Sequence, residues 1–231
     1  DDGDDVCTDD ACVNGACVFA PTGVEGCCSE PLFRDDFSED LGWTYDFSWE
    51  RGAATAGAGS VYNNDPADDH STTADDFLAG VIIGGNAPTN LGGFYWLTSP
   101  EIDLSQASTP HLSYWRWLNS DYTPYMQNKV DVYNGATWIN LWQTGSSPGT
   151  SDAAWGHHDY DVTPHKNAAF RVRFGYNIGS SGVYTISSWN LDDVQVYDAA
   201  PLAGSANLCC AATSDCQGIA AGTECVGGEC Q

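Results

Sequence analysis

One stretch of the sequence concentrates oxygen ligands of the kind that bind metal ions. The segment "NNDPADDHSTTADD", residues 63–76, holds Asn64 and five aspartates. Ca²⁺ takes roughly six to eight oxygens from carboxylates and loop carbonyls. We therefore expect a calcium site here, with a flexible acidic loop as the alternative; the spacing is not that of an EF-hand. The carboxylates proposed as ligands are Asp65, Asp68, Asp69, Asp75 and Asp76.

A second group of carboxylates lies near the two ends of the central region. Asp192 and Asp193 stand in "WNLDDV", and Asp36 stands in "RDDF". The first and last strands of a jelly roll commonly lie side by side, which would bring these carboxylates together. The group is a second candidate cation site. Arg34 offers a simpler alternative, because its guanidinium could neutralise one of the carboxylates in a salt bridge.

Aromatic residues in polar surroundings suggest a surface that could bind sugars. Trp142, Tyr122, Tyr125 and Trp155 fall in loop-like contexts, where an exposed ring can stack on a pyranose. We name Trp142, Tyr122 and Tyr125 as candidate ligand-binding residues and expect most of the remaining tryptophans to fill a core.

Catalytic motifs are absent from the sequence. The central region has no cysteine, no GxSxG and no HExxH, and a strand would point the adjacent His157 and His158 to opposite faces. Paired carboxylates at neighbouring positions suit cation binding or surface charge better than acid/base catalysis. We expect that the protein is not an enzyme.

The charge of the chain excludes several classes of partner. Acidic residues outnumber basic ones 32 to 7, which gives a formal net charge of −25. Nucleic acid or an anionic membrane would be repelled. No apolar run approaches the ~18–20 residues that a membrane-spanning helix needs, so membrane insertion is not expected either.

Cysteines are confined to the two ends of the chain, five at each. Such clusters in short Gly- and Asp-rich segments are typical of disulfide frameworks in an oxidising compartment. Zinc is the alternative, but the histidines lie outside the clusters and the CxxC pairs of zinc ribbons are missing. We expect a secreted protein, extracellular or at the cell surface, and an Asp in place of Met at position 1 fits removal of a leader. The cysteines are Cys7, Cys12, Cys17, Cys27, Cys28, Cys209, Cys210, Cys216, Cys225 and Cys230.

The odd number of cysteines at each end has a consequence for assembly. If all ten are oxidised, an odd number of disulfides must join the N-terminal group to the C-terminal group. Within one chain such a bond would close a long loop and stabilise the fold by about 5 kcal/mol. Between chains it would couple unlike surfaces, and repetition would give a ring or a filament.

Periodicity predicts an all-β protein. The segment "KVDVYNGATWINLWQ", residues 129–143, alternates apolar and polar residues around an Asn-Gly turn signal. Residues 111–119, 169–178 and 183–198 have the same character. We expect a jelly-roll β-sandwich with small disulfide-rich knots at both termini, and long intervening loops such as residues 52–93 favour the jelly-roll type. The expected divisions are residues 1–30, 31–200 and 201–231.

Five motifs, taken in order, resemble the MAM-like jelly-roll domains of large secreted bacterial proteins. They are "FRDDFSEDLGWT", "LTSPEIDLSQASTPHLSYWRWLN", "VDVYNGATWINLW", "RVRFGYN" and "WNLDDVQVYD", which together span roughly residues 33–198. The terminal segments resemble the Asp- and Cys-rich repeats of myxobacterial surface proteins. The resemblance implies a non-catalytic domain that serves binding or assembly.

These observations lead to two functional hypotheses. The first is an extracellular structural or adhesive subunit that assembles head-to-tail with copies of itself, with its acidic loops as calcium clamps. The alternative is a carbohydrate- or protein-binding accessory domain of a larger secreted enzyme, with glycans as its partners.

Overall fold

The computed structural model describes residues 31–57, 59–71 and 75–198, together with the backbone of four short strands nearer the ends. The chain divides into two compact units, one formed by residues 32–196 and the other by residues 1–31 and 197–231. The second unit includes two antiparallel hairpins, β1 (Thr8–Val13) with β2 (Ala16–Pro21) and β15 (Cys225–Val226) with β16 (Glu229–Cys230). The side chains of all ten cysteines, and with them the expected disulfides, lie outside the described residues.

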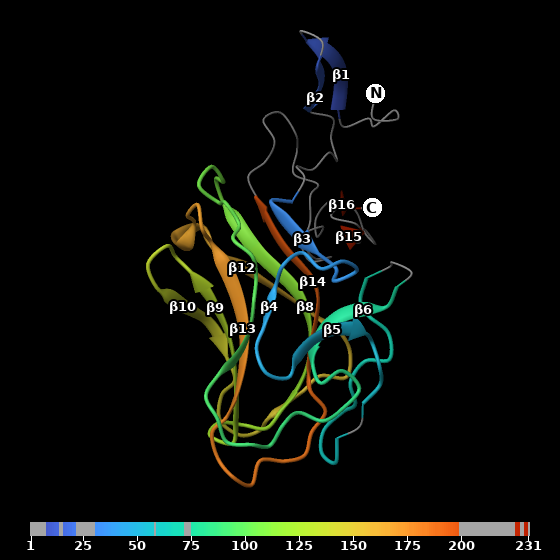
Figure 1. The fold of residues 1–231 in the computed structure, drawn as a ribbon, viewed down its shortest axis with the longest axis vertical. Helices are drawn as coiled ribbons and strands as arrows, with labels where there is room; N and C mark the ends of the chain where they lie inside the picture. The colour runs from blue at the N-terminus through green and yellow to red at the C-terminus, as the bar shows by residue number, and fades with distance from the viewer. Residues whose placement is uncertain are drawn as a thin grey trace. The chain divides into compact units, whose positions relative to one another are not determined.

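The larger unit is a β-sandwich of two sheets (Figure 1), which confirms the all-β expectation. The five-stranded sheet has the order β10 (Trp138–Gln143), β9 (Met126–Tyr133), β13 (Arg171–Ile178), β7 (Tyr95–Thr98) and β4 (Thr44–Tyr45). The seven-stranded sheet has the order β11 (Thr150–Ser151), β8 (Pro110–Ser120), β14 (Trp189–Asp198), β6 (Phe77–Val81) and β5 (Trp49–Ala53), with β12 (Gly156–Asp161) paired to β8 and β3 (Phe33–Asp35) to β14. A single 3₁₀ turn, η1 (Thr163–His165), is the one helical element of the described residues.

The Asn-Gly turn forms the hairpin that the sequence predicts. Gly135 has a φ of +89°, a left-handed conformation that suits glycine. The side chain of Asn134 accepts hydrogen bonds from the backbone N–H groups of Ala136 and Thr137, and Tyr133 then pairs with Trp138. The turn therefore sets the register of β9 and β10.

Aromatic residues from both sheets form the centre of the core. Trp189 lies in β14 with its ring centroid 5.5 Å from that of Trp49 and 5.9 Å from that of Phe174, which belongs to the opposite sheet. These three rings are buried, as is Trp43. The contact between rings of opposite sheets fixes the two layers against each other.

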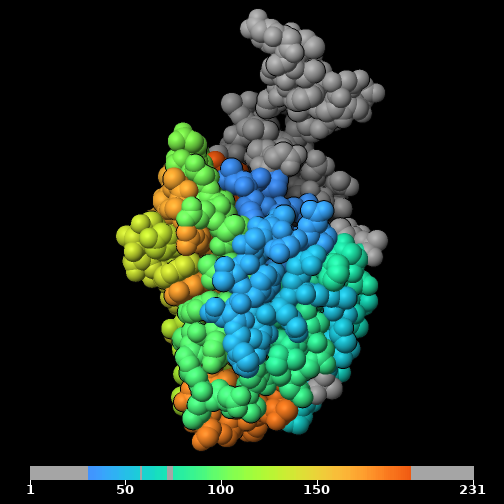
Figure 2. Space-filling model, viewed as in Figure 1, coloured from blue at the N-terminus to red at the C-terminus, as the bar shows by residue number. Residues whose placement is uncertain are grey.

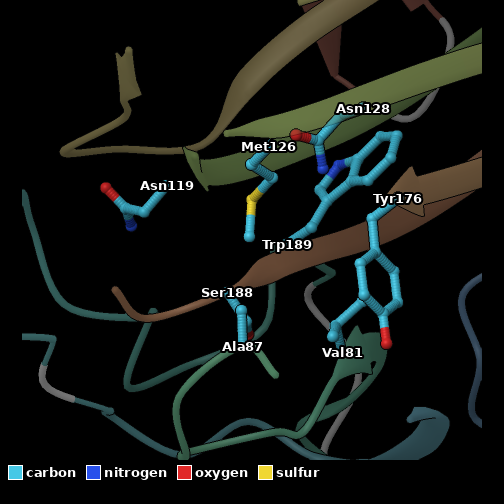
Figure 3. Close-up of a pocket in the computed structure, with 8 residues that line it drawn as sticks. All are labelled: Val81, Ala87, Asn119, Met126, Asn128, Tyr176, Ser188 and Trp189. Carbon is cyan, nitrogen blue, oxygen red and sulfur yellow. The ribbon is translucent and has the colours of Figure 1, made fainter. Parts of the chain in front are cut away.

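A small cavity lies between the sheets (Figure 3). At about 10 Å³ it is near the lower limit for a single water molecule and is too small for a ligand. The residues that line it are Val81, Ala87, Asn119, Met126, Asn128, Tyr176, Ser188 and Trp189.

The first and last strands of the larger unit are neighbours, as expected. β3 pairs with β14 in antiparallel register, with Asp35 opposite Val194 and Phe33 opposite Val196. On the side shown in Figure 2, much of the surface belongs to the blue and teal residues that run from β3 to β6.

Two segments differ from the sequence prediction. Residues 52–93, expected to be a long loop, contain β6, whose residues Leu78 to Val81 are all buried and so show no alternation. Residues 183–188, expected to begin the last strand, are not a strand, because their backbone bonds to two loops: Thr185 accepts from Ser60, and Ile186 accepts from Ala87.

Candidate functional site

Strand β8 presents two tryptophans on the outer face of the seven-stranded sheet. Tyr114 and Leu118 of this strand point into the core and are fully buried, so Trp115 and Trp117 lie on the opposite face and are partly exposed. His157 of the neighbouring strand β12 is paired with Trp115, and their ring centroids are 5.1 Å apart. The outer face is therefore aromatic where β8 and β12 meet.

An open hollow lies beside Trp117. It has a volume of about 310 Å³, at the lower end of the roughly 300–1,000 Å³ typical of ligand-binding clefts. Its lining combines two aromatic rings with two exposed amides and contains no titratable group other than the phenol of Tyr62. The residues are Tyr62, Asn63, Asn64, Trp117 and Ala153.

The aromatic wall of the hollow is held in place by hydrogen bonds. The indole N–H of Trp117 donates to the backbone oxygen of Asn64 over 2.8 Å. Trp155 packs edge-on against Trp117 with ring centroids 5.9 Å apart, and its own N–H donates to the backbone oxygen of Asp68. Because both indoles are bonded to the 64–68 loop, the loop and the rings keep one relative position.

A buried carboxylate supports the loop from below. Asp65 is 3% exposed, and its Oδ1 accepts hydrogen bonds from the backbone N–H of Ser188 at 2.8 Å and from the side-chain amide of Asn190 at 2.9 Å. Burial raises the pKa of Asp65, although these hydrogen bonds oppose the shift. The Ser187 hydroxyl also donates to the backbone oxygen of Asn63.

A group of four tyrosines continues from the hollow around a second buried carboxylate. Tyr62 meets Tyr184 edge-on at 6.5 Å, and Tyr122 meets Tyr125 edge-on at 5.2 Å. Asp121 is 1% exposed and accepts the backbone N–H groups of both Tyr122 and Tyr184. Burial, and then the charge of Asp121, raises the pKa of Tyr62. Its phenol is therefore uncharged at neutral pH.

The structure separates the three candidate ligand-binding residues. Tyr122 and Tyr125 lie in a loop, as expected, and belong to the tyrosine group next to the hollow. Trp142 instead lies in β10, packs against the core, and has the guanidinium of Arg116 5.0 Å from its ring. It does not line the hollow.

The sequence interpretation missed Trp117 and Tyr62, which form the two aromatic walls. We expected most tryptophans to be core residues, whereas Trp115 and Trp117 face outward. The signal was present in "SYWRWL", where Tyr114 and Leu118 share one face of the strand and the two tryptophans share the other.

Five of the candidate cation ligands lie in one acidic cluster, which we define as Asp69, Asp75, Asp76, Asp192 and Asp193. Burial raises the pKa of Asp69, and the charges of Asp76, Asp75 and Asp193 raise it further. Neighbouring carboxylates repel one another, and a bound proton or cation relieves that repulsion.

Asp192 is the most buried member of the acidic cluster, with no exposed surface. Its Oδ2 accepts the backbone N–H groups of His70 at 2.7 Å and Ser71 at 3.1 Å. Burial, and then the neighbouring charge of Asp193, raises its pKa to about 8 in spite of these hydrogen bonds.

Arg34 and His70 flank Asp193 in the acidic cluster. The Arg34 guanidinium lies 3.7 Å from Asp193 Oδ1, and His70 Nδ1 lies 2.7 Å from Asp193 Oδ2. The predicted salt bridge between Arg34 and one carboxylate of this motif is therefore present. His70 also stacks on Trp115 with ring centroids 3.6 Å apart, which links the acidic cluster to the aromatic face.

Three other candidate ligands do not join the acidic cluster. Asp36 accepts hydrogen bonds from Ser38, Asp65 is buried beneath the hollow, and Asp68 is exposed. Within residues 31–57, 59–71 and 75–198, no three His, Cys, Asp or Glu side chains are arranged to hold a metal ion. No helix among the described residues is long and apolar enough to cross a membrane.

Comparisons with known proteins give similarities of fold at low sequence identity. No protein-family model matches the chain. No curated protein matches it either. One similar solved structure is TmCBM61 in complex with β-1,4-galactotriose, at 11% identity and a TM-score of 0.43, covering 74% of this chain and 99% of that one.

Two further similar structures come from named bacteria. An adhesin domain of Lys-gingipain from Porphyromonas gingivalis has 15% identity and a TM-score of 0.42, covering 71% of this chain and 96% of that one. A xylan-binding domain from Paenibacillus barcinonensis has 13% identity and a TM-score of 0.39, covering 75% and 95%. At these values the similarities do not bear on what this chain binds.

Proposed function

We propose that this chain is a non-catalytic glycan-binding module that acts outside the cell. The observation that carries the proposal is the open hollow between Trp117 and Tyr62, in which aromatic rings and exposed amides line one space. Pyranose rings present apolar C–H faces and polar hydroxyl edges, so this combination of groups suits them.

The groups around the hollow have different roles in the proposed binding. Trp117 and Tyr62 offer ring surface for stacking. The amide of Asn64 is exposed and makes no hydrogen bond within the described part of the chain, so it can donate to and accept from sugar hydroxyls. Tyr184, 47% exposed, extends the aromatic surface to a further sugar unit.

Preorganisation supports the same proposal. The Trp117 indole is already bonded to the loop that carries Asn63 and Asn64, and Asp65 anchors that loop to β14. A surface that needs little reordering pays less conformational entropy on binding.

Binding of polysaccharides to the full chain tests the proposal, by affinity electrophoresis and calorimetry with a panel of neutral and anionic polymers. Trp117→Ala should weaken binding by about tenfold or more, equivalent to about 1.4 kcal/mol. Trp138→Ala is the matched control, because Trp138 is partly exposed on the other sheet and does not line the hollow. No binding to any polymer would contradict the proposal, and equal binding by wild type and Trp117→Ala would contradict its assignment to this hollow.

Calcium binding is a second proposal and rests on the acidic cluster. In its support, Asp193 Oδ1 is buried and makes no hydrogen bond within the described residues, and its nearest cation, Arg34, is 3.7 Å away. Calcium added after chelation should raise the melting temperature of the wild type and leave that of Asp69→Asn unchanged. An identical calcium response in both proteins would show that the ion binds elsewhere.

Head-to-tail assembly stays a prediction of the sequence. Its support is the odd number of cysteines at each end, and most of those cysteines lie outside the described residues.

A further inference from the structure

We infer that the hollow beside Trp117 takes an uncharged glycan and discriminates against polysaccharides that carry carboxylate or sulfate groups. This inference rests on the proposed function and narrows it to a ligand class. It follows from where the cations of the chain are and from what surrounds the hollow.

All seven basic residues lie in the described part of the chain, and none of them lines the hollow. Each is engaged with another group. Five of them contact carboxylates or backbone oxygens: Arg34 with Asp193, Arg51 with the carbonyls of Phe37 and Ser38, Lys166 with the carbonyl of Ala107, Arg171 with Glu101, and Arg173 with Asp131.

The other two basic residues are also engaged elsewhere. Lys129 lies over the ring of Phe94 at 4.7 Å, on the outer face of the five-stranded sheet. Arg116 is next to Trp117 in sequence, but its guanidinium bonds to Asp152 at 3.0 Å and lies over Trp142. Neither a lysine nor an arginine is therefore available at the hollow to pair with an acidic sugar.

The surroundings of the hollow are acidic as well as free of unpaired lysine and arginine side chains. Asp68 is exposed in the loop that carries Asn63 and Asn64. Asp121 is buried beneath the tyrosine group and has no basic hydrogen-bond partner in the part of the chain that the structure describes. With a net charge of −25 on the whole chain, a uronate or sulfate brought to this surface meets repulsion that nothing local offsets.

The groups that are present suit an uncharged ligand. A neutral pyranose can stack on the rings of Trp117 and Tyr62 without the free-energy cost of removing a charge from water. The side-chain amides of the hollow can form hydrogen bonds with its hydroxyls. Burying an unpaired carboxylate at the same place would cost free energy, because no donor with a positive charge replaces its water.

A matched pair of polymers tests the inference. The neutral polysaccharide that binds best in the panel is oxidised at its primary hydroxyls to the corresponding uronate, so that both polymers keep the same backbone. We expect the oxidised form to bind at least about tenfold more weakly in low salt. Raising the salt to about 0.5 M should recover part of that loss, because salt screens repulsion, and should leave binding of the neutral form unchanged.

The outcomes separate this inference from the proposed function. Oxidised polymer that binds as well as the neutral one, or a panel in which only anionic polymers bind, would overturn the inference and leave glycan binding intact. A panel in which nothing binds overturns the proposed function itself. Neutral binding that survives Trp117→Ala overturns the assignment to this hollow, and with it the inference.

Discussion

The guanidinium of Arg173 lies 3.7 Å from the ring centroid of Trp96, on the outer face of the five-stranded sheet. The same guanidinium lies 4.1 Å from the ring centroid of Trp138. The stack continues through Phe94, 5.0 Å from Trp96, and Tyr133, 5.5 Å from Trp138. Two pairs of aromatic rings, with the Arg173 guanidinium between them, therefore span strands β7, β13, β9 and β10 on the solvent side of the sheet and stabilise their packing.

Replacing Arg173 should destabilise the fold more than replacing its neighbour Arg171. Arg173 pairs with Asp131, which is 6% exposed, so Arg173→Leu leaves a mostly buried carboxylate without its cation. We expect a loss of about 2–4 kcal/mol in the free energy of unfolding. Arg171→Leu breaks a more exposed pair with Glu101 and should cost under about 1 kcal/mol. Denaturant titration of both variants measures the difference, and equal losses would contradict this account.

Gly175 is required because the indole of Trp96 lies against it. The two residues are paired across β13 and β7, and a Cβ added at Gly175 would overlap the six-membered ring of Trp96. Gly175→Ala should therefore destabilise the protein by about 1–3 kcal/mol, as measured by denaturant titration. Gly145→Ala is the control, because nothing lies within 4 Å of its Cβ position. A Gly175→Ala protein as stable as this control would show that Trp96 does not occupy that place.

Two substitutions of Asp65 can separate the effect of its charge on stability and binding from the effect of its hydrogen bonds. Asp65 Oδ2 and Asn190 Oδ1 are both buried acceptors with no donor within the described residues. Asp65→Asn removes the buried charge and supplies an N–H donor in place of an unpaired acceptor. It should keep or raise stability at neutral pH and should retain glycan binding.

Asp65→Ala should behave in the opposite way. It removes the acceptor for Ser188 and Asn190 and should cost about 1–3 kcal/mol of stability, with weaker glycan binding because the 63–65 loop loses its anchor. Thermal unfolding and calorimetry on the three proteins provide the comparison. If Asp65→Asn were as damaging as Asp65→Ala, the carboxylate charge itself would be needed.

The sequence predicts the strands better than the site, because the strands follow from neighbouring residues whereas the site depends on contacts between residues far apart in the sequence. The hairpin of β9 and β10 follows from an Asn-Gly turn and alternating residues, all local in sequence. β6 was missed because its residues Leu78 to Val81 are all buried and show no alternation. The hollow depends on a bond between Trp117 and Asn64, which are 53 residues apart, so no local pattern reveals it.

The candidate cation ligands show the same division. The pairing of β3 with β14 was predictable from the order of strands, and it brings Arg34 to Asp193 as expected. Composition alone could not separate Asp69, in the acidic cluster, from Asp65, beneath the hollow. The two residues are four positions apart in one acidic segment. Their environments differ because Asp65 contacts Ser188, just before β14, whereas Asp69 lies near Asp193 of β14.

Asp192 predicts how stability depends on pH in the absence of calcium. Its pKa is raised from 3.8 to about 8, so the unfolded chain ionises first and the folded state holds the proton more tightly. The contribution of this group to stability is complete below about pH 4 and is lost as the pH rises toward 8. Asp192→Asn should flatten that decline. The variant can be less stable than the wild type at every pH, because an amide replaces the carboxylate that accepts the backbone N–H groups of His70 and Ser71.

Asp103→Asn is the control for this pH experiment. Hydrogen bonds to Ser105 lower the pKa of Asp103, so its titration falls below the window in which Asp192 ionises. Unfolding free energies of the three proteins between about pH 4 and 8, measured with a chelator present, provide the test. A wild-type stability that rises across this range, or one that falls equally in Asp192→Asn, would refute the assignment.

The backbone register of the terminal hairpins predicts two of the disulfides. Cys12 is directly opposite Cys17 in β1 and β2, and Cys225 is directly opposite Cys230 in β15 and β16. Opposed residues of an antiparallel pair have Cα atoms about 4.5 or 5.5 Å apart, and both spacings lie within the range that a disulfide spans. Peptide mapping of the non-reduced protein should therefore recover the pairs 12–17 and 225–230. Recovery of any of these four cysteines bonded to another partner would contradict the register. Recovery of both pairs leaves three cysteines at each end, so an odd number of bonds must still join the two groups if all are oxidised.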